Sequence, residues 1–527
     1  MKWILMYSKL KFLCICFLFF STFSNGYALD KKQPIVDELQ ILIDVSGSMK
    51  HNDPYNLRIP AVKLLVNLLP NGTKAGIWLF AENTKVLVET GVVNNQWKKK
   101  ALSRIRKIHS VGLFTNIEDA IQNSAKEWFA SSEQQNRNLI LLTDGMVDIS
   151  KDIMQSAESR ERVMVDQIPL LQQAGVKVQA IALSSHADED LLNKLAFNTN
   201  GWSETAESAD QLQKVFFKMF KKAVPQDTVP IKGNMFTIDK AINEFSVLIF
   251  KDSGALETQL IAPDNSKIVS SVKNKNVAWL NEKNYDLITV KKPKAGNWKI
   301  IAKMDPDNQV MIVTDLKLQV DDFPSHISEK ESLELMAYFT DQQQLISRDD
   351  FLSLIDISIE QTDPLGAKKV WEMNPVSDKQ GLFSQTIGAT FAKGKHSIKI
   401  IADGKTFQRE SVHTIEVVES PVVIETTVNN EQRTGSLKVI ADEKVINTEM
   451  RAVQVIISQI GKADENQVIE KTADGWGLVV AAPELGESKV INFSVMAKTV
   501  EGLSTSPNIK PIVIEDGLFA TVEELVI

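Results

Sequence analysis

Hydrophobic residues in the first 223 positions alternate between short continuous runs and helical spacing. Four short runs are apolar or β-branched, as in buried strands: 39–43, 75–80, 139–142 and 176–183. Three segments between them repeat apolar residues every three or four positions, which predicts helices: 58–69, 116–129 and 160–173. This alternation predicts a doubly wound α/β domain, in which helices cover both faces of a parallel sheet.

The pattern changes after this domain. A last helix is expected to begin near Ser208, with a capping-box sequence at 208–211 and an apolar face of Leu212, Val215, Phe216 and Phe220. Prolines in the segment 224–230 end that helix and predict a linker. Beyond it the apolar period becomes two, which predicts these strands: 245–250, 287–290, 298–302, 332–339, 355–359, 397–402, 437–440, 453–457 and 491–495.

Many short strands separated by polar turns predict antiparallel β-sandwiches. A faint repeat, in which Gly296, Gly381 and Gly475 open strands one or two residues before an aromatic residue, recurs at spacings of 85 and 94 residues. These spacings are close to the ~100 residues of an immunoglobulin-like sandwich. With 527 residues the chain is too long for one core. We therefore predict an α/β domain at 37–223, a linker at 224–230 and three immunoglobulin-like β-sandwiches at 231–320, 321–419 and 420–527.

Polar side chains follow the ends of the predicted strands. Asp44, Ser46 and Ser48 come directly after the run 39–43, Asp144 comes after the run 139–142, and Thr115 lies just before a predicted helix. In open α/β sheets, ligands bind at the carboxyl ends of the strands. Two carboxylates and three hydroxyls gathered at that edge suit a hard cation such as Mg²⁺, or Mn²⁺ or Ca²⁺, and do not suit zinc.

The order Asp-x-Ser-x-Ser, then a distant Thr, then a distant Asp resembles the metal-ion-dependent adhesion site of von Willebrand factor type A (VWA) domains. All five positions match, and the segments 115–121 and 195–201 are similar to the family as well. The resemblance covers roughly residues 37–223. It implies that Ser46, Ser48 and Thr115 are direct ligands and that Asp44 and Asp144 act directly or through water. Because neutral hydroxyls leave the cation short of negative charge, it can take a carboxylate from a protein partner.

Three carboxylates near these loops have other expected roles. Asp53 either borders the metal or begins the next helix, and we favour the start of the helix. Asp148 and Glu118 can accept hydrogen bonds around the site, but solvation at the surface is the expected role of both.

The N-terminus has the pattern of a secretory signal peptide. Three lysines precede the apolar run 12–20, and small residues follow up to Ala28. We predict a signal peptide at 1–28, and the alternative is an uncleaved anchor, since 12–29 carries no charge. Cleavage would remove both cysteines, Cys14 and Cys16, and would take the formal net charge from −8 to −11. A large exported chain without disulfides fits the periplasm, surface or surroundings of a bacterium.

The mild negative charge gives no basic footprint for nucleic acid. Enzyme motifs are incomplete: a haloacid-dehalogenase-like phosphatase needs a carboxylate at Ser46, and the nearest P-loop match has Lys399 in place of the first glycine. The sequence therefore predicts no enzyme but an exported, metal-dependent protein-binding protein, whose partner presents an acidic residue. The alternatives are a periplasmic scaffold that assists envelope-complex assembly and a hydrolase with unrecognised catalytic groups. The sequence does not indicate an oligomeric state.

Overall fold

The computed structural model describes residues 37–515 except 132–134, 185, 208–210, 253, 273, 322, 330, 378, 420–421, 430–431, 443–451, 460–464, 470, 473–474, 485–486, 499–503, 506–508 and 510–511. The predicted signal peptide, both cysteines and most of the predicted capping box at 208–211 lie outside the described residues. Within the described part of the chain, no helix is both long enough and apolar enough to cross a bilayer.

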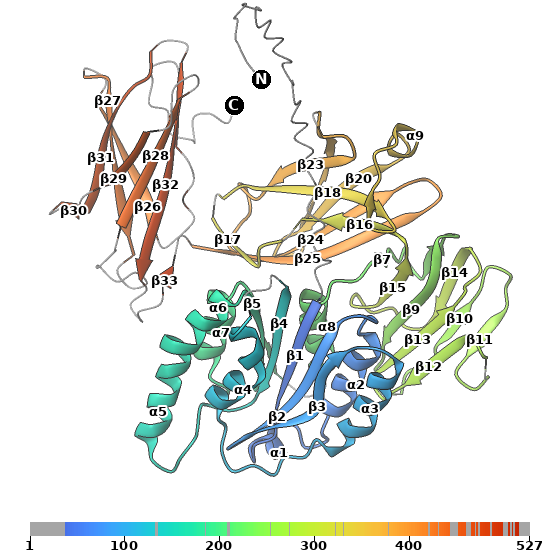
Figure 1. Ribbon diagram of the computed structural model, residues 1–527. Coiled ribbons are helices and arrows are strands. Elements are labelled where there is room, and N and C mark those ends of the chain that lie inside the picture. The colour runs from blue at the N-terminus through green and yellow to red at the C-terminus, as the bar shows by residue number, and fades with distance from the viewer. Residues whose placement is uncertain are drawn as a thin grey trace, which may run out of the picture. The chain divides into compact units, whose positions relative to one another are not determined.

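The N-terminal α/β domain is built on a six-stranded sheet in the order β3-β2-β1-β4-β5-β6 (Figure 1). Its strands are β1 (Asp37–Asp44), β2 (Lys74–Phe80), β3 (Thr84–Val92), β4 (Asn136–Thr143), β5 (Val176–Leu183) and β6 (Trp202–Ala206). All neighbouring pairs are parallel except β2 and β3, which run antiparallel. The structure thus confirms the predicted doubly wound sheet and adds an antiparallel edge strand.

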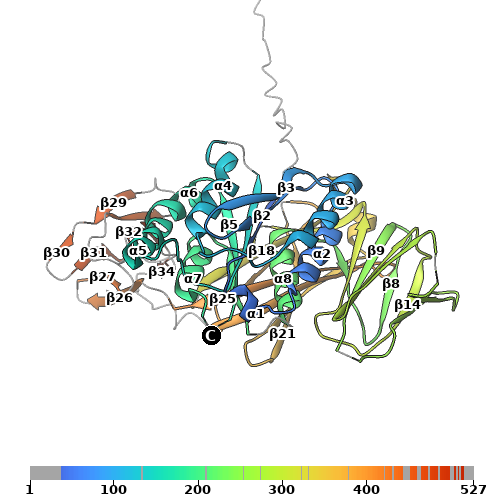
Figure 2. The same cartoon turned by 90° about the horizontal axis from the view of Figure 1, so that it is seen from below.

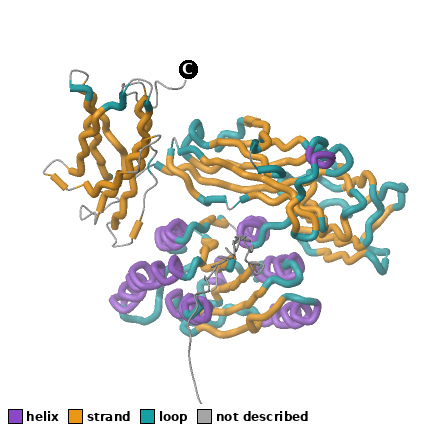
Figure 3. The backbone as a smooth tube through the Cα atoms, turned by 45° about the horizontal axis from the view of Figure 1, so that its top comes forward, coloured by secondary structure: helices purple, strands orange, loops and turns teal. Residues whose placement is uncertain are grey.

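Helices cover both faces of this sheet (Figure 3). They are α1 (Met49–Asn52), α2 (Arg58–Leu68), α3 (Asn95–Arg104), α4 (Ile117–Phe129), α5 (Ile153–Arg162), α6 (Ile168–Gln173), α7 (Glu189–Asn198) and α8 (Leu212–Ala223). One apolar core lies between the sheet and α2, α3 and α8, and a second lies between the sheet and α4, α6 and α7. The two cores explain why the central strands are apolar on both faces.

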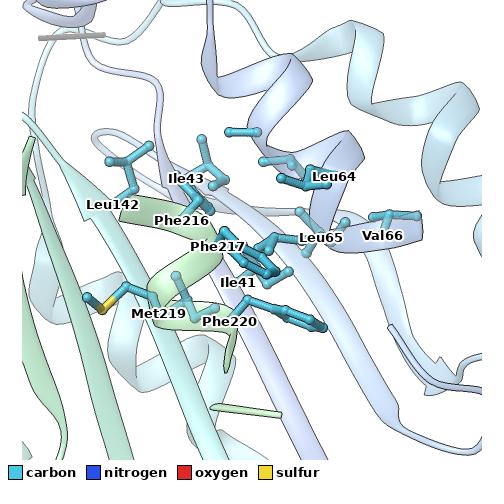
Figure 4. Close-up of a cluster of buried hydrophobic side chains, with 14 of the residues drawn as sticks. Ile41, Ile43, Leu64, Leu65, Val66, Leu142, Phe216, Phe217, Met219 and Phe220 are labelled. Carbon is cyan, nitrogen blue, oxygen red and sulfur yellow. The ribbon is translucent and has the colours of Figure 1, made fainter. Parts of the chain in front are cut away.

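Helix α8 packs against the sheet and lies beside α2 (Figure 2). Its aromatic residues Phe216, Phe217 and Phe220 are at most 1% exposed and belong to the same core as residues of β1 and α2. Figure 4 shows these rings close to Ile41 and Leu65. Burial of each such ring stabilises the fold by roughly 1.5–3 kcal/mol. The predicted apolar face of the last helix is therefore confirmed.

The predicted helix at 160–173 is wrong as a single element. Helix α5 ends at Arg162, a π-helical turn spans Val163–Gln167, and α6 begins at Ile168. Pro169 stands in the first turn of α6. Proline has no backbone N–H to donate, so a regular helix running through this position would lose a hydrogen bond, whereas the first turn needs none.

The region after α8 contains strands that alternate buried and less buried positions, as the period of two requires. In β24 (Gly394–Asp403), for example, Ile398, Ile400 and Ala402 are buried. A first apolar core of this region lies among its N-terminal strands. They are β8 (Met235–Ile238), β9 (Ile242–Phe250), β10 (Gln259–Ile261), β11 (Lys267–Val269), β12 (Val277–Asn281), β13 (Tyr285–Lys291), β14 (Gly296–Ile301) and β15 (Gln309–Thr314). Strands β11-β10-β14-β8 form one sheet, and β12-β13-β9-β15 belong to a second.

A second core lies among the elements from β16 to β25. They are β16 (Leu316–Val320), β17 (His326–Ser328), β18 (Leu333–Asp341), β19 (Gln344–Leu345), α9 (Asp349–Leu352), β20 (Asp356–Thr362), β21 (Lys368–Glu372), β22 (Asn374–Pro375), β23 (Leu382–Ile387), β24 (Gly394–Asp403) and β25 (Gln408–Val418). Strands β16-β18-β23-β22 form one sheet of this part, and β18 also pairs with β19.

A third core belongs to the C-terminal strands. They are β26 (Val422–Asn429), β27 (Thr434–Ala441), β28 (Ala452–Gln459), β29 (Glu465–Ile469), β30 (Lys471–Thr472), β31 (Gly475–Ala481), β32 (Ser488–Lys498), β33 (Ser504–Thr505) and β34 (Ile512–Glu515). Strands β26-β27-β31-β30 form one sheet, and β29-β28-β32 with β33 and β34 form the other. The predicted antiparallel β-sheet character after the α/β domain is confirmed, whereas the immunoglobulin-like topology stays a prediction.

The segment 224–230, predicted to be a linker, is in part a strand. Thr228 and Val229 form β7, which is at most 3% exposed and pairs with β15 on one side and β25 on the other. Through β7, one sheet from each of the first two predicted sandwiches belongs to a single ten-stranded sheet. A two-residue strand shows no alternation in the sequence, and the flanking prolines only indicate where regular structure stops.

Candidate metal site

The five predicted metal ligands lie at the carboxyl-terminal edge of the central strands: Asp44 ends β1, Ser46 and Ser48 lie in the turn to α1, Thr115 lies just before α4, and Asp144 follows β4. Strands β1 and β4 are parallel neighbours that align Ile43 with Leu142. Their next residues therefore emerge at the same edge of the sheet. The structure brings together residues that are about 100 positions apart, as the sequence predicts.

A chain of hydrogen bonds connects four of the five residues. The backbone N–H of Ser46 donates to Asp44 Oδ1 over 2.8 Å. The hydroxyls of Ser46 and Ser48 are 2.9 Å apart, and the hydroxyl of Ser48 donates to Asp144 Oδ1 over 2.8 Å. The oxygen atoms of both serines are thus within reach of one small cation placed beside Asp144.

Thr115 completes the set through a close approach to Gly145. A Cβ built on Gly145 would lie 3.4 Å from Thr115 Oγ1 and 3.9 Å from Ser48 Oγ, so both hydroxyls border the same space. Asp148 holds Thr115 in place with its backbone: Thr115 N–H donates to Asp148 O over 2.6 Å, and Asp148 N–H donates back over 3.0 Å. Thr115 is 4% exposed.

Gly112 lets the second loop approach the first. A Cβ on Gly112 would lie 2.1 Å from the Cβ of Ala81, a distance that no real side chain tolerates. Gly112 forms an isolated parallel bridge with Ser46, and its N–H donates to Val45 O over 3.0 Å. The carbonyl of Gly112 would be 3.3 Å from a Cβ on Gly47. These contacts explain why glycines stand beside the predicted ligands.

Burial governs the electrostatics of the two carboxylates. Asp44 and Asp144 are 0% and 1% exposed. Burial raises the pKa of Asp44 to about 6, and the nearby charge of Asp144 acts in the same direction. Burial also raises the pKa of Asp144, against hydrogen bonds from Asn52 and Ser48 that lower it. A divalent cation among these oxygens would favour both ionised forms.

The donors fit a hard cation. All five side chains offer oxygen, which Mg²⁺, Mn²⁺ and Ca²⁺ prefer, and none offers sulfur or nitrogen. Across the described residues, no group of three or more His, Cys, Asp or Glu side chains is arranged to hold a metal. The proposed ligand set is not a group of that kind, because it combines only two carboxylates with three hydroxyls.

Three residues that the sequence reasoning missed hold the two carboxylates. Thr143 donates its hydroxyl to Asp44 Oδ2 over 2.6 Å, and Asn52 donates its amide to Asp144 Oδ2 over 2.9 Å. Arg58 donates from Nη1 to the backbone oxygen of Asp44 over 2.6 Å. Thr143 adjoins Asp144 in the sequence, but its bond to Asp44 depends on the pairing of β1 with β4 and is invisible without the sheet order.

Asp53 holds the N-terminus of helix α2 with its side chain, in line with the expected role at the start of the helix. Its carboxylate accepts hydrogen bonds from the backbone N–H groups of Leu57 and Arg58, at 2.6 and 3.2 Å. It also pairs with the guanidinium of Arg58 at 2.8 Å, and both side chains are at most 1% exposed. Because Arg58 in turn bonds Asp44 O, this buried pair fixes the start of α2 against the metal-site loop.

The expected surface role of Glu118 is wrong. Its side chain is 14% exposed, pairs with Arg162 at 2.8 Å and accepts the hydroxyl of Ser159 over 2.7 Å. The pKa of Glu118 is lowered, because these hydrogen bonds and the charge of Arg162 outweigh its partial burial. Glu118 therefore ties α4 to α5. Asp148 acts on the site through its backbone bonds to Thr115, a role that its side-chain chemistry did not predict.

Large apolar side chains are exposed on the loops that carry the predicted ligands or follow them, and in the first turn of α5. They are 55–84% exposed and comprise Tyr55, Val111, Leu113, Met146, Ile153 and Met154, together called the apolar rim. Val111 and Leu113 flank Gly112, and Met146 adjoins Gly145. Exposed apolar side chains that gather near one site indicate a surface that contacts another molecule.

Residues 38–218 match the family model of the von Willebrand factor type A domain. This N-terminal part of the chain is a VWA domain, and the β-rich region that follows it lies outside the match. No curated protein matches the chain.

Solved structures that match include VWA proteins of varied origin. A von Willebrand factor type A structure from Catenulispora acidiphila is 13% identical, with 59% of this chain and 64% of that chain covered and a TM-score of 0.30. Proximal thread matrix protein 1 from the mussel byssus, described as having a zinc-occupied MIDAS motif, is 17% identical, with 38% and 50% covered and a TM-score of 0.29. The matched regions thus span less than two thirds of either structure's own chain.

Proposed function

We propose that this protein is an exported, divalent-metal-dependent protein-binding protein. VWA domains generally serve metal-dependent interaction or adhesion, and residues 38–218 form such a domain. The observation that carries the proposal is the convergence of Asp44, Ser46, Ser48, Thr115 and Asp144 at one sheet edge, with oxygen atoms as the only donors. The signal-peptide pattern supports a location in the periplasm or on the surface of a bacterium.

The bonding of the carboxylates supports different roles for the two. Asp44 accepts hydrogen bonds at both of its oxygens, from Ser46 and Thr143, so it is suited to act through water. Ser48 donates its proton to Asp144 and accepts the hydroxyl proton of Ser46, which leaves one lone pair of its oxygen available to a cation. Mg²⁺ bound there would supply a Lewis-acidic centre for a carboxylate of the partner. The protein's own residues orient the ligands, and burial separates Asp44 from the bulk solvent.

The apolar rim supports a protein partner. An acidic side chain at the metal would bring its neighbours against Val111, Leu113 and Met146, which are 77%, 80% and 55% exposed. Contact between apolar surfaces around a central polar anchor excludes water and strengthens such an interaction. We therefore propose a partner segment that has an acidic residue flanked by apolar ones. We propose binding and not catalysis, and expect no turnover of ester, phosphate or peptide substrates.

Titration calorimetry with Mg²⁺ and Mn²⁺ tests the site. Thr115→Val removes one hydroxyl while keeping the shape of the side chain, so we expect weaker metal binding. Thr84→Val is the matched control, because the Thr84 hydroxyl is buried and makes no hydrogen bond within the described structure. Ser46→Ala should weaken binding less than loss of either carboxylate, since a hydroxyl carries no formal charge. Equal affinities in wild type and Thr115→Val would contradict the site.

A further inference from the structure

A second site lies far along the chain from the metal ligands. A cavity of about 750 Å³ is lined by α8, by β6, β24 and β25, and by the loop that precedes β15. This volume falls within the ~300–1,000 Å³ of small-molecule sites. None of the five predicted metal ligands lines it. Five lysines and five carboxylates line it, and the lysines are Lys218, Lys221 and Lys222 from α8, with Lys395 and Lys399 from β24.

Three of these lysines have carboxylate partners. Lys218 and Lys395 share the single carboxylate of Glu204, at 3.3 and 3.6 Å. Lys399 lies 3.4 Å from Glu410. Three ammonium groups thus face two carboxylates, so these pairs leave one positive charge without a matching negative one.

The other two lysines have no carboxylate partner in the described structure. Lys222 Nζ donates to Thr414 O over 2.9 Å and lies 4.0 Å from the ring centroid of Trp202. Lys221 Nζ lies 5.1 Å from the ring centroid of Phe217 and makes no ion pair or hydrogen bond within the described part of the chain. Burial lowers the pKa of both, that of Lys222 to about 7. A bound anion would offset that desolvation.

Three further acidic residues line the cavity, Asp305, Asp307 and Asp363, and the Asp363 carboxylate accepts the backbone N–H groups of Leu365 and Ala367. Asp305 and Asp307 pair with Lys214, which does not line the cavity, at 2.6 and 3.5 Å. Lys221 and Lys222 therefore remain the cationic groups available to a ligand.

The cavity also holds buried acceptors. Gln309 and Glu410 are 8% and 7% exposed, and both line the cavity. Gln309 Oε1 accepts no hydrogen bond from the described residues, whereas Glu410 Oε2 lies 3.4 Å from the ammonium group of Lys399. An unmade hydrogen bond on a buried polar atom costs ~1–3 kcal/mol, so Gln309 Oε1 favours a ligand that brings a donor.

We propose that this cavity binds a small organic carboxylate that also carries hydroxyl or amino groups. The carboxylate would lie against the ammonium groups of Lys221 and Lys222, and a hydroxyl or amino group would face Gln309. Amino acids and sugar acids both have this chemistry. The site would act independently of the metal and lies on different residues from the proposed adhesion function.

Calorimetry of the full-length protein in EDTA tests the proposal, because chelation keeps ligand carboxylates from binding at the metal site. The probes are L-glutamate and D-galacturonate, and D-galactose serves as the sugar without a carboxylate. We expect one of the acids to bind and galactose not to bind. Lys221→Gln should weaken that binding about tenfold or more, as loss of a charged hydrogen bond of ~1.5–3 kcal/mol implies.

The matched control is Lys267→Gln, an exposed lysine on β11 that does not line the cavity, and it should leave the affinity unchanged. Gln309→Leu should weaken binding without altering charge, which separates ligand contact from a general electrostatic effect. Lys221 makes no bond that its substitution would break, so circular dichroism should stay that of wild type. Absence of binding by both acids at about 10 mM would overturn the proposal, as would an affinity in Lys221→Gln within twofold of wild type.

Discussion

Asp44→Asn separates the charge of the proposed metal site from its hydrogen bonds. Asp44 Oδ1 accepts from Ser46 N–H and Oδ2 accepts from the Thr143 hydroxyl. An asparagine can keep both bonds, because its oxygen accepts from Ser46 and its amide donates to the hydroxyl oxygen of Thr143, which accepts as well as donates. Asp44→Ala keeps neither bond. The pair of variants therefore distinguishes metal binding from structural support.

The magnitudes follow from burial. Thr143 is 0% and Ser46 is 2% exposed, so Asp44→Ala leaves two buried donors without a partner. Each such donor costs ~1–3 kcal/mol, and we expect Asp44→Ala to lower local stability by about 2–6 kcal/mol. In wild type, Mg²⁺ at a concentration of about 100 times its Kd should add ~2.7 kcal/mol of stability. Neither variant should gain this increment.

Hydrogen exchange of peptides covering β1 and β4 measures local stability in the full-length protein. In EDTA, exchange in Asp44→Asn should equal that of wild type within a factor of a few, and exchange in Asp44→Ala should be faster. Addition of Mg²⁺ should slow exchange in wild type alone. Equal protection of Asp44→Asn and wild type by Mg²⁺ would refute the role of the Asp44 charge in metal binding. Equal protection of Asp44→Ala and Asp44→Asn in EDTA would refute the structural role of its hydrogen bonds.

Three further predictions concern other parts of the chain. Burial and the nearby lysines lower the pKa of His326 to about 4 and outweigh the half-exposed Glu416, 3.8 Å away. The unfolded state therefore binds more protons than the folded state between pH 4 and 6.5. The free energy of unfolding should fall by up to ~3 kcal/mol as the pH drops through this window. In acid unfolding, His326→Gln should reduce this dependence of stability on pH. Leu113→Ser and Met146→Ser should each weaken partner capture roughly tenfold while calorimetry shows unchanged metal affinity, because they remove only apolar contact; a parallel loss of metal affinity would contradict this. Mass spectrometry of the exported protein should find an N-terminus at or near Leu29, whereas a chain retaining the first 28 residues would indicate an anchor.

The sequence predicted the elements whose apolar pattern is long and regular. Strands such as β5 and β24 and helices such as α2 and α4 carry enough buried positions to show their period. Elements with weak patterns were missed. Strand β3 mixes exposed and buried residues at the sheet edge, and β6 is only five residues long. Strand β7 is shorter still, and its place between β15 and β25 depends on pairing across about 180 residues.

The same distinction holds at the metal site. The five predicted ligands could be found because their types, order and position after strands resemble a known family. Their supports could not be found in this way. Asn52 ends the short helix α1 and Arg58 begins α2, and their roles follow from where these helices place them beside Asp144 and Asp44. The ligands follow from local sequence, whereas the groups that hold them follow from tertiary packing.

Partner capture with and without metal is the most direct test of the proposed function. Immobilised full-length protein, wild type or Asp44→Asn, is exposed to envelope extract in Mg²⁺ or in EDTA, and retained proteins are identified by mass spectrometry. We expect wild type to retain a partner in Mg²⁺ and Asp44→Asn not to retain it. EDTA should release this partner from wild type, and Mg²⁺ or Mn²⁺ should restore its binding. An acidic peptide from the partner should displace it. Retention of the same partner by Asp44→Asn, or by wild type in EDTA, would contradict it.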